Sequence, residues 1–210
     1  MGSYERKINQ TDSKIQTSFL QLLQDYNLNE VSINDICNQA SINRSTFYRH
    51  FEDKYELLEI IEADLISQLS SISKSKIESS TSFSELANNL ENYVDILLDV
   101  IQDNYEKLAI LLSKKGDPNF HSILKQLLQS RMEESWNSVD RQIKPNTNGI
   151  DTKLAIDFIV ASDMAIIEYT INNPEIEHNQ IKRTFSQLLI KGPLSTLYDS
   201  VNKGEKDEFK

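Results

Sequence analysis

Apolar residues recur every three or four positions along almost the whole chain. The first such stretch places five of them on one helical face: Ile15, Phe19, Leu22, Leu23 and Tyr26. The same spacing returns at about 33–40, 44–51, 53–72, 83–103, 105–114, 119–141, 151–172 and 177–191. The 210 residues include only 5 Gly and 4 Pro, and every Pro falls between these stretches. The pattern predicts an all-α fold, with one more short helix after Pro193.

The charge of the chain is acidic but unevenly distributed. Lys and Arg number 22 against 32 Asp and Glu, a net charge of -10, which taken alone argues against a nucleic-acid partner. Residues 1–54, however, carry six basic side chains against seven acidic ones, so most of the excess lies in residues 55–210. Residues 43–51 contain two Arg and no acidic residue. The charge therefore does not exclude DNA as a partner of the N-terminal part.

Several classes of protein are excluded by what the sequence lacks. A single cysteine, Cys37, cannot form an internal disulfide or a cysteine-based zinc site. No stretch approaches the roughly 18 apolar residues of a membrane span, and no signal peptide opens the chain. His121 and His178 have no second His or Cys nearby, so we predict no metal and no cofactor. Without a phosphate-binding loop or nucleophile motif, we expect a cytoplasmic protein that is not an enzyme and has no membrane partner.

Residues 32–54 form the most informative segment, because they predict two short helices joined by a tight turn, a helix-turn-helix. Ser32 and Asp35 have the spacing of a capping box at the start of the first helix. The second helix is short enough to lie in a major groove about 12 Å wide. Its first turn offers three side chains to base edges: Arg44, Ser45 and Thr46. Three others could reach phosphates, although Arg49 could instead pair with a surface carboxylate: Tyr48, Arg49 and His50.

Lys54 stands at the first position of the following helix, where a cation opposes the helix macrodipole. A bound phosphate would reverse the sign of that interaction, because free N–H groups and the ammonium would converge on one anion. The hydroxyl of Ser32 and its neighbouring amides would make a similar anion site. Phe47 and Phe51 share a helical face and are predicted to be core residues with no DNA role.

The stretch SINDICNQASINRSTFYRHFEDKYELL resembles the DNA-binding segment of the TetR/AcrR family of bacterial transcriptional regulators, over about residues 10–60. The resemblance implies that three residues read bases: Arg44, Ser45 and Thr46. It implies that four others hold phosphates: Ser32, Tyr48, His50 and Lys54. The sequence departs from the family at Ser41, where the family usually has Gly in the turn. We expect a serine to adopt this turn at modest steric cost.

The resemblance also implies two domains, a helix-turn-helix DNA-binding domain over 1–54 and a larger helical ligand-binding and dimerisation domain over 55–210. The helix at about 53–72 connects them. Residues 154–171 are apolar nearly all round and therefore need cover on both sides. The helix at 177–191 is expected to cover one side and a second subunit the other. A two-fold homodimer would place its recognition helices about 34–36 Å apart, matching a palindromic operator in double-stranded DNA.

The larger domain offers few residues for a small-molecule effector. Asp163 lies within the apolar helix, so its carboxylate should be paired, near the end of an interface or facing a cavity. Three aromatic residues could line a pocket with it, with ordinary core packing as the alternative for each: Tyr105, Phe120 and Trp136. Four carboxylates at i, i+4 spacing share one helical face: Glu91, Asp95, Asp99 and Asp103. A solvated face is favoured for them over a site for a cationic ligand or a hard metal ion.

The sequence therefore favours a dimeric transcriptional regulator that responds to an unidentified small-molecule effector. Repression, rather than activation, rests on the family resemblance alone. The alternative is a helical sensor or scaffold that acts through protein partners, because residues 55–210 carry no nucleic-acid signature.

Overall fold

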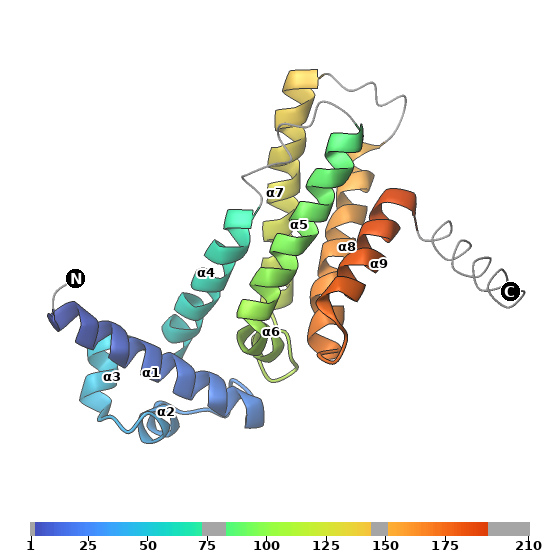
Figure 1. Cartoon of the computed structure of the whole chain (residues 1–210). Coiled ribbons are helices and arrows are strands. Elements are labelled where there is room, and N and C mark those ends of the chain that lie inside the picture. The colour runs from blue at the N-terminus through green and yellow to red at the C-terminus, as the bar shows by residue number, and fades with distance from the viewer. Residues whose placement is uncertain (1–2, 73–82, 144–150, 193–210) are drawn as a thin grey trace, which may run out of the picture. The chain divides into compact units, whose positions relative to one another are not determined.

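The computed structural model describes residues 3–72, 83–143 and 151–192. Within these ranges it has nine α-helices and no strand, which confirms the all-α prediction (Figure 1). The helices are α1 (Ser3–Asp25), α2 (Ile33–Gln39), α3 (Arg44–His50), α4 (Lys54–Ile72), α5 (Phe83–Asp103), α6 (Tyr105–Leu111), α7 (Phe120–Ile143), α8 (Thr152–Asn172) and α9 (His178–Lys191). The short helix predicted after Pro193 lies outside the described residues. None of the described helices has both the length and the apolar composition needed to cross a membrane.

Packing divides the chain into two compact units, one of Met1–Gln68 with Asn104–Leu124 and one of Leu69–Asp103 with Lys125–Lys210. The division falls within α4 and within α7, whereas the predicted functional domains separate at residues 54 and 55. The first unit thus contains all of the helix-turn-helix together with α6. The predicted domain boundary, which concerns function and not packing, stays a prediction.

The first unit buries the apolar faces that the helical spacing predicts. Along α1, Ile15 and Phe19 are fully buried and Leu23 is 1% exposed. Phe47 of α3 is fully buried and Phe51 is 4% exposed, with their ring centroids 5.8 Å apart, so both are core residues as predicted. Such burial contributes about 2 kcal/mol for each large apolar side chain. The helix-turn-helix is therefore fixed by its inner face, which leaves its outer face available for function.

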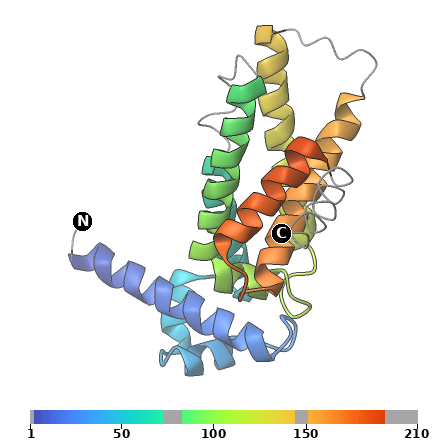
Figure 2. The same cartoon turned by 45° about the vertical axis from the view of Figure 1, so that its right-hand side comes forward.

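The second unit packs α5, α8 and α9 against one another, and Figure 2 shows these three helices side by side. Each contributes an apolar stripe, with Leu98 on α5, Val160 on α8 and Ile181 on α9 among the buried residues. Lys182 of α9 also forms an ion pair with Asp95 of α5.

Ser41 adopts the left-handed conformation in the turn between α2 and α3, with φ at 49°. The N–H of Ser41 donates to Asn38 O at 3.1 Å and that of Ile42 to Cys37 O at 3.0 Å, the two bonds of a Schellman motif. Ser41 is the one non-glycine residue of the described ranges with positive φ. The turn thus needs the conformation that glycine adopts freely, and the serine adopts it at a cost of about 1 kcal/mol.

Replacing Ser41 by Gly is therefore expected to stabilise the protein by about 0.5 kcal/mol. The glycine removes the cost of the left-handed conformation. This gain in stability is only partly offset by the larger conformational entropy that glycine gives the unfolded chain. Thermal unfolding of the Ser41→Gly variant should show a higher midpoint than the wild type. Ser41→Ala, which keeps the Cβ, is the control and should give no gain. Equal midpoints for the glycine and alanine variants would contradict the expectation.

Candidate functional site

The outer face of α3 carries the side chains predicted to meet DNA. Arg44, Ser45 and Tyr48 are exposed, and Tyr48 remains 49% accessible. The guanidinium of Arg44 donates from Nη2 to the hydroxyl of Tyr48 at 3.1 Å and lies 5.7 Å from the centre of its ring. This bond raises the pKa of Arg44, which already lies far above neutrality. The arrangement presents a permanently charged, pre-oriented hydrogen-bond donor on an exposed helix.

Arg49 and Thr46 lie one turn apart on the same helix. The Nη2 of Arg49 donates to Thr46 Oγ1 at 3.4 Å, and the structure shows no carboxylate paired with this exposed arginine in the described residues. The ion pair that competed with a DNA role for Arg49 is thus not formed among them. Thr46 is only partly accessible, and its hydroxyl accepts the bond from Arg49.

His50 is held inside the protein by Asp12, a residue that the sequence pattern did not indicate. Its Nδ1 lies 2.6 Å from Oδ1 of Asp12 on α1, and its side chain is 8% exposed. This contact ties the end of α3 to α1 across 38 residues of sequence. A phosphate could reach the imidazole only through the small part of it that remains exposed. The predicted phosphate role of His50 stays a prediction.

Lys54 uses all three hydrogens of its ammonium within the protein. Nζ donates to Leu28 O at 2.8 Å, to Asn29 O at 3.3 Å and to Val31 O at 2.7 Å. An ammonium has three donors, so a phosphate would have to replace one of these carbonyls. Burial of the side chain lowers the pKa of Lys54. The cation at the helix start is thus compensated by carbonyls of the α1–α2 loop, which local sequence patterns do not reveal.

Ser32 and Asp35 form the predicted capping box at the start of α2. The N–H of Asp35 donates to Ser32 Oγ at 3.3 Å, and the N–H of Ser32 donates to Asp35 Oδ2 at 2.9 Å. The hydroxyl of Ser32 also donates to the same carboxylate at 2.5 Å, and the bonds from Ser32 lower the pKa of Asp35. The box therefore occupies donors that the predicted anion site would use, and it places a carboxylate beside them.

The residues predicted to line an effector pocket fall in different units. Tyr105 and the fully buried Phe120 belong to the first unit, whereas Asp163 belongs to the second. The side chain of Trp136 lies outside the described residues. Among these four, the structure does not show a common pocket.

Asp163 is paired, which is the first of the three alternatives predicted for a carboxylate in this apolar helix. Its carboxylate is 1% exposed, and Oδ2 accepts a hydrogen bond from the hydroxyl of Tyr93 on α5 at 2.9 Å. The other oxygen, Oδ1, is buried and has no partner within the described residues. Burial raises the pKa of Asp163 to about 7, although the bond from Tyr93 opposes the shift. Counting only the described residues, the second unit thus has a buried carboxyl group with one oxygen that accepts no hydrogen bond.

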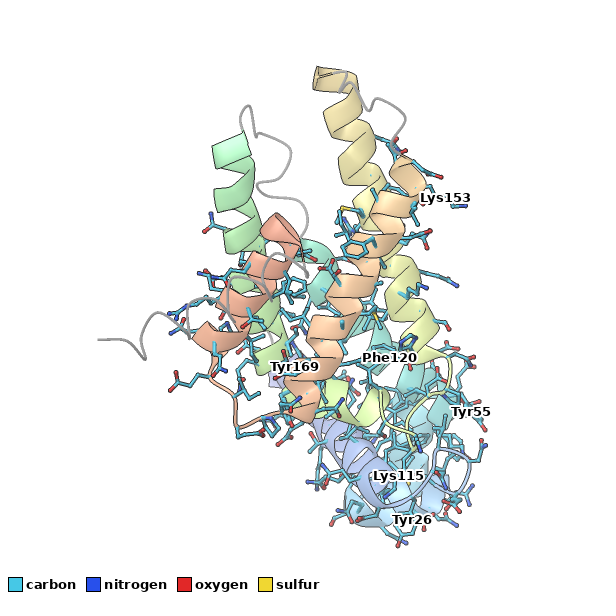
Figure 3. All side chains as sticks on the ribbon, turned by 90° about the vertical axis from the view of Figure 1, so that its right-hand side faces the viewer. Tyr26, Tyr55, Lys115, Phe120, Lys153 and Tyr169 are labelled. Carbon is cyan, nitrogen blue, oxygen red and sulfur yellow. The ribbon has the colours of Figure 1, made fainter. Side chains whose placement is uncertain are left out.

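A groove of about 370 Å³ runs between α8 and α9, and its lining is almost entirely apolar. Its large apolar side chains from these two helices include Phe158, Ile166, Tyr169, Ile181, Phe185 and Leu188. Phe158 is 54% exposed and Tyr169 49%, and Leu154 on the same helix is 68% exposed. Figure 3 labels Tyr169 on α8. So many exposed apolar side chains on neighbouring turns are typical of a surface that another protein covers.

The described acidic residues of the row on α5 are exposed to solvent, as the sequence favoured, with the side chain of Asp99 75% and that of Asp95 40% exposed. Asp95 is paired with Lys182, and His178 Nε2 lies 3.9 Å from Oδ1 of Asp99. Both partners come from α9, which the sequence pattern could not place beside α5. Asp103 is exposed, and the side chain of Glu91 lies outside the described residues.

Two family models match the chain. One, described as bacterial regulatory proteins of the tetR family, matches residues 20–61, and the other, described as a transcriptional regulator C-terminal region, matches residues 88–191. The first match contains α2, α3 and the start of α4, the segment that carries the exposed face described above. No curated protein matches the chain.

Three solved structures of similar fold are described as regulators or as an activator. The chain is 21% identical to a TetR transcriptional regulator from Streptococcus agalactiae 2603V, covering 88% of this chain and 96% of that one with a TM-score of 0.57. A putative TetR-family regulator from Syntrophomonas wolfei str. Goettingen has 18% identity, the same coverage and a TM-score of 0.63. The dihydroxyacetone kinase operon activator DhaS has 20% identity, covers 85% and 92% of the two chains and has a TM-score of 0.54. At these identities the likeness shows a shared fold.

Proposed function

The chain belongs to the TetR family of bacterial transcriptional regulators, and we propose that it is a homodimeric repressor that binds a palindromic operator and releases it on binding a small-molecule effector. The exposed face of α3 carries this proposal. Arg44, Ser45 and Tyr48 point outward from a helix whose opposite side is anchored by Phe47. We assign the protein no catalytic step, and we place its action in the cytoplasm, where its DNA is.

In this proposal Arg44, Ser45 and Thr46 contact base edges, while Tyr48 and Arg49 contact phosphates. Ser32 contributes its hydroxyl at the start of α2. His50 and Lys54 act first by holding α3 and the α1–α2 loop in place, through Asp12 and the loop carbonyls. Rigid support of this kind keeps the reading helix in one orientation, which sequence-specific contacts require.

The homodimer is proposed on the exposed apolar surface of α8 and its groove with α9. Leu154, Phe158 and Tyr169 would be covered by the same residues of a second copy, because a two-fold interface brings one patch against itself. Two copies would then present two α3 helices to successive turns of one DNA face, about 34–36 Å apart. Repression rests on the family's usual mode of action, and DhaS, a protein of similar fold, is described as an activator.

Effector release requires a small molecule to favour a conformation in which the two α3 helices have the wrong spacing. Asp163 is the predicted pocket residue whose surroundings support such a role. Its buried Oδ1, for which the described part of the chain provides no partner, could accept a hydrogen bond from a donor on the effector.

Operator binding tests the proposal. We expect the wild type to retard a palindromic fragment from upstream of its own gene. Arg44→Ala should lose about 2 kcal/mol of operator affinity, roughly a thirtyfold change, and less affinity for unrelated DNA, because a base contact is removed. Fluorescence anisotropy at two salt concentrations measures both. Arg183→Ala, which removes an exposed arginine from α9, is the matched control and should bind like the wild type.

The same assay tests the dimer when it is run beside sedimentation. Phe158→Glu buries a charge in the proposed interface, so the variant should sediment as a monomer at concentrations where the wild type is a dimer, and it should bind the operator more weakly. A monomeric wild type that binds the palindrome would overturn the dimer. A chain that retards no genomic fragment would favour the protein-binding scaffold instead.

A further inference from the structure

A hollow of about 680 Å³ opens in the first unit, between the α1–α2 loop, α4 and the α6–α7 loop. It lies apart from the exposed face of α3 and from the α8–α9 groove. Figure 3 labels two of its lining residues, Tyr55 on α4 and Lys115 on the α6–α7 loop. Gly116 lets that loop pass close to the end of α6, since a Cβ there would come within 2.4 Å of Ile110 O.

Glu62 is the unexpected residue of this hollow. It is 6% exposed, and its Oε1 is buried without a partner within the described residues. The carboxyl groups of Glu62 and Asp117 line the same hollow, and burial followed by the charge of Asp117 raises the pKa of Glu62 to about 7. A buried carboxyl group beside a second carboxylate favours a proton or another cation near it, because two negative charges repel strongly out of water.

The other charged groups of the hollow leave it negative. Glu30 and Glu59 add two carboxylates to those of Glu62 and Asp117, against Lys114 and Lys115. Glu30 accepts hydrogen bonds from the backbone and side chain of Asn27, and Nζ of Lys115 donates to Gln24 O at 2.6 Å.

Asp117 already has one neutral partner. Its Oδ1 accepts bonds from the N–H and the side-chain amide of Asn119, which stabilise the carboxylate without neutralising it. Among the described residues, neither Glu62 nor Asp117 forms an ion pair with a Lys or Arg side chain.

The rest of the wall suits a carbon chain. Leu58 is 4% exposed and Leu28 8%, while Tyr55 is 49% exposed. A metal ion is disfavoured, since no group of three His, Cys, Asp or Glu in the described ranges is arranged to hold one. We propose that this hollow binds an organic ammonium ion, whose N–H groups donate to Asp117 and Glu62 and whose alkyl part lies against Leu58 and Tyr55.

Binding exchanges one cation for another. The ammonium takes the place of the proton that Glu62 holds below about pH 7, and this proton leaves to the solvent. Occupancy should therefore tighten as the pH rises toward 7, by up to about tenfold per pH unit, and level off above it.

Isothermal titration of the full chain with 1,4-diaminobutane at pH 6, 7 and 8 tests the proposal. We expect saturable binding with release of about one proton at pH 6, measured from the heats in buffers of different ionisation enthalpy. Glu62→Gln, which keeps the size of the side chain, should weaken binding roughly tenfold or more and remove its pH dependence. Glu106→Gln, which neutralises an exposed carboxylate on α6, is the matched control and should bind like the wild type.

Three results would overturn the proposal. They are no binding of the diamine at millimolar concentration, equal affinity of the wild type and Glu62→Gln, and equal binding of uncharged 1-butanol. Saturable binding of Mg²⁺ or Ca²⁺ without binding of the diamine would assign the hollow to a metal ion instead. None of these measurements involves DNA, so a failure of the ammonium site can be distinguished from a failure of the proposed DNA-binding function.

Discussion

Replacing Asp163 by Asn is expected to change how the stability of the protein depends on pH. Relative to the wild type, the free energy of unfolding of the variant should rise by about 3 kcal/mol between pH 5 and pH 8. The reason is the burial of Asp163, which raises the pKa of its carboxyl group to about 7 in the folded protein. In the unfolded chain the same group ionises near its ordinary value of about 4.

The sign follows from counting protons. Between about pH 4 and pH 7 the folded protein holds a proton on Asp163 and the unfolded chain does not, so each rise of one pH unit costs the wild type about 1.4 kcal/mol. The loss ends once the pH passes the folded pKa of about 7. An asparagine cannot ionise, and its carbonyl still accepts the bond from Tyr93 that Oδ2 accepts now. Its buried amide group adds an offset that does not vary with pH.

Urea unfolding of both proteins at fixed protein concentration, at pH 5, 6, 7 and 8, measures this difference. Glu62 also makes the stability of the wild type vary with pH, but it is present in both proteins and cancels in the comparison. Asp103→Asn removes an exposed carboxylate from α5 and is the control, for which we expect no such rise. A difference between Asp163→Asn and the wild type that stays constant across the four pH values would contradict the assignment.

Helical spacing and capping residues were sufficient to predict most of the fold. The stretch predicted at 83–103 is the observed α5, and those at 151–172 and 177–191 differ from α8 and α9 by one residue at the start. The stretch at 105–114 ends earlier, at Leu111, because α6 gives way to the turns that lead to Gly116. The pattern succeeds because side chains three and four apart determine which face of a helix is buried.

The partners of charged residues were not predictable, because they lie far away in the sequence. The pattern marked Asp163 as unusual, but Tyr93 is 70 residues away and comes from another helix. It marked Lys54 as a cation in an unfavourable place, but the compensating carbonyls lie 23 to 26 residues earlier. Asp12 carried no signal in the sequence, since an acidic residue on a helix is ordinary. Local patterns thus identify an anomaly, and only the tertiary structure identifies what resolves it.

Replacing Lys54 by Met is expected to lower the free energy of unfolding by about 3 kcal/mol. The methionine keeps the apolar stem but leaves the carbonyls of Leu28, Asn29 and Val31 without their common donor, and hydrogen bonds from a charged donor are worth about 1.5–3 kcal/mol each before the cost of burying the charge. Urea unfolding at pH 7 measures the loss. Lys153→Met, at an exposed lysine of α8 labelled in Figure 3, is the matched control and should differ little from the wild type.

Operator binding by Lys54→Met separates the two roles that a lysine at the start of α4 can have. A lysine that neutralises a phosphate contributes about one unit to the slope of log affinity against log salt, and its loss weakens binding to all sequences alike. Because the ammonium is already saturated by three carbonyls, we expect the slope to stay unchanged at a temperature where the variant is folded. A slope reduced by about one, with normal stability, would instead return Lys54 to the phosphate contact that its sequence position predicts. Loss of stability without a change of slope would show that Lys54 fixes the α1–α2 loop to α4. Its role in DNA binding would then be to stabilise the domain that carries α3.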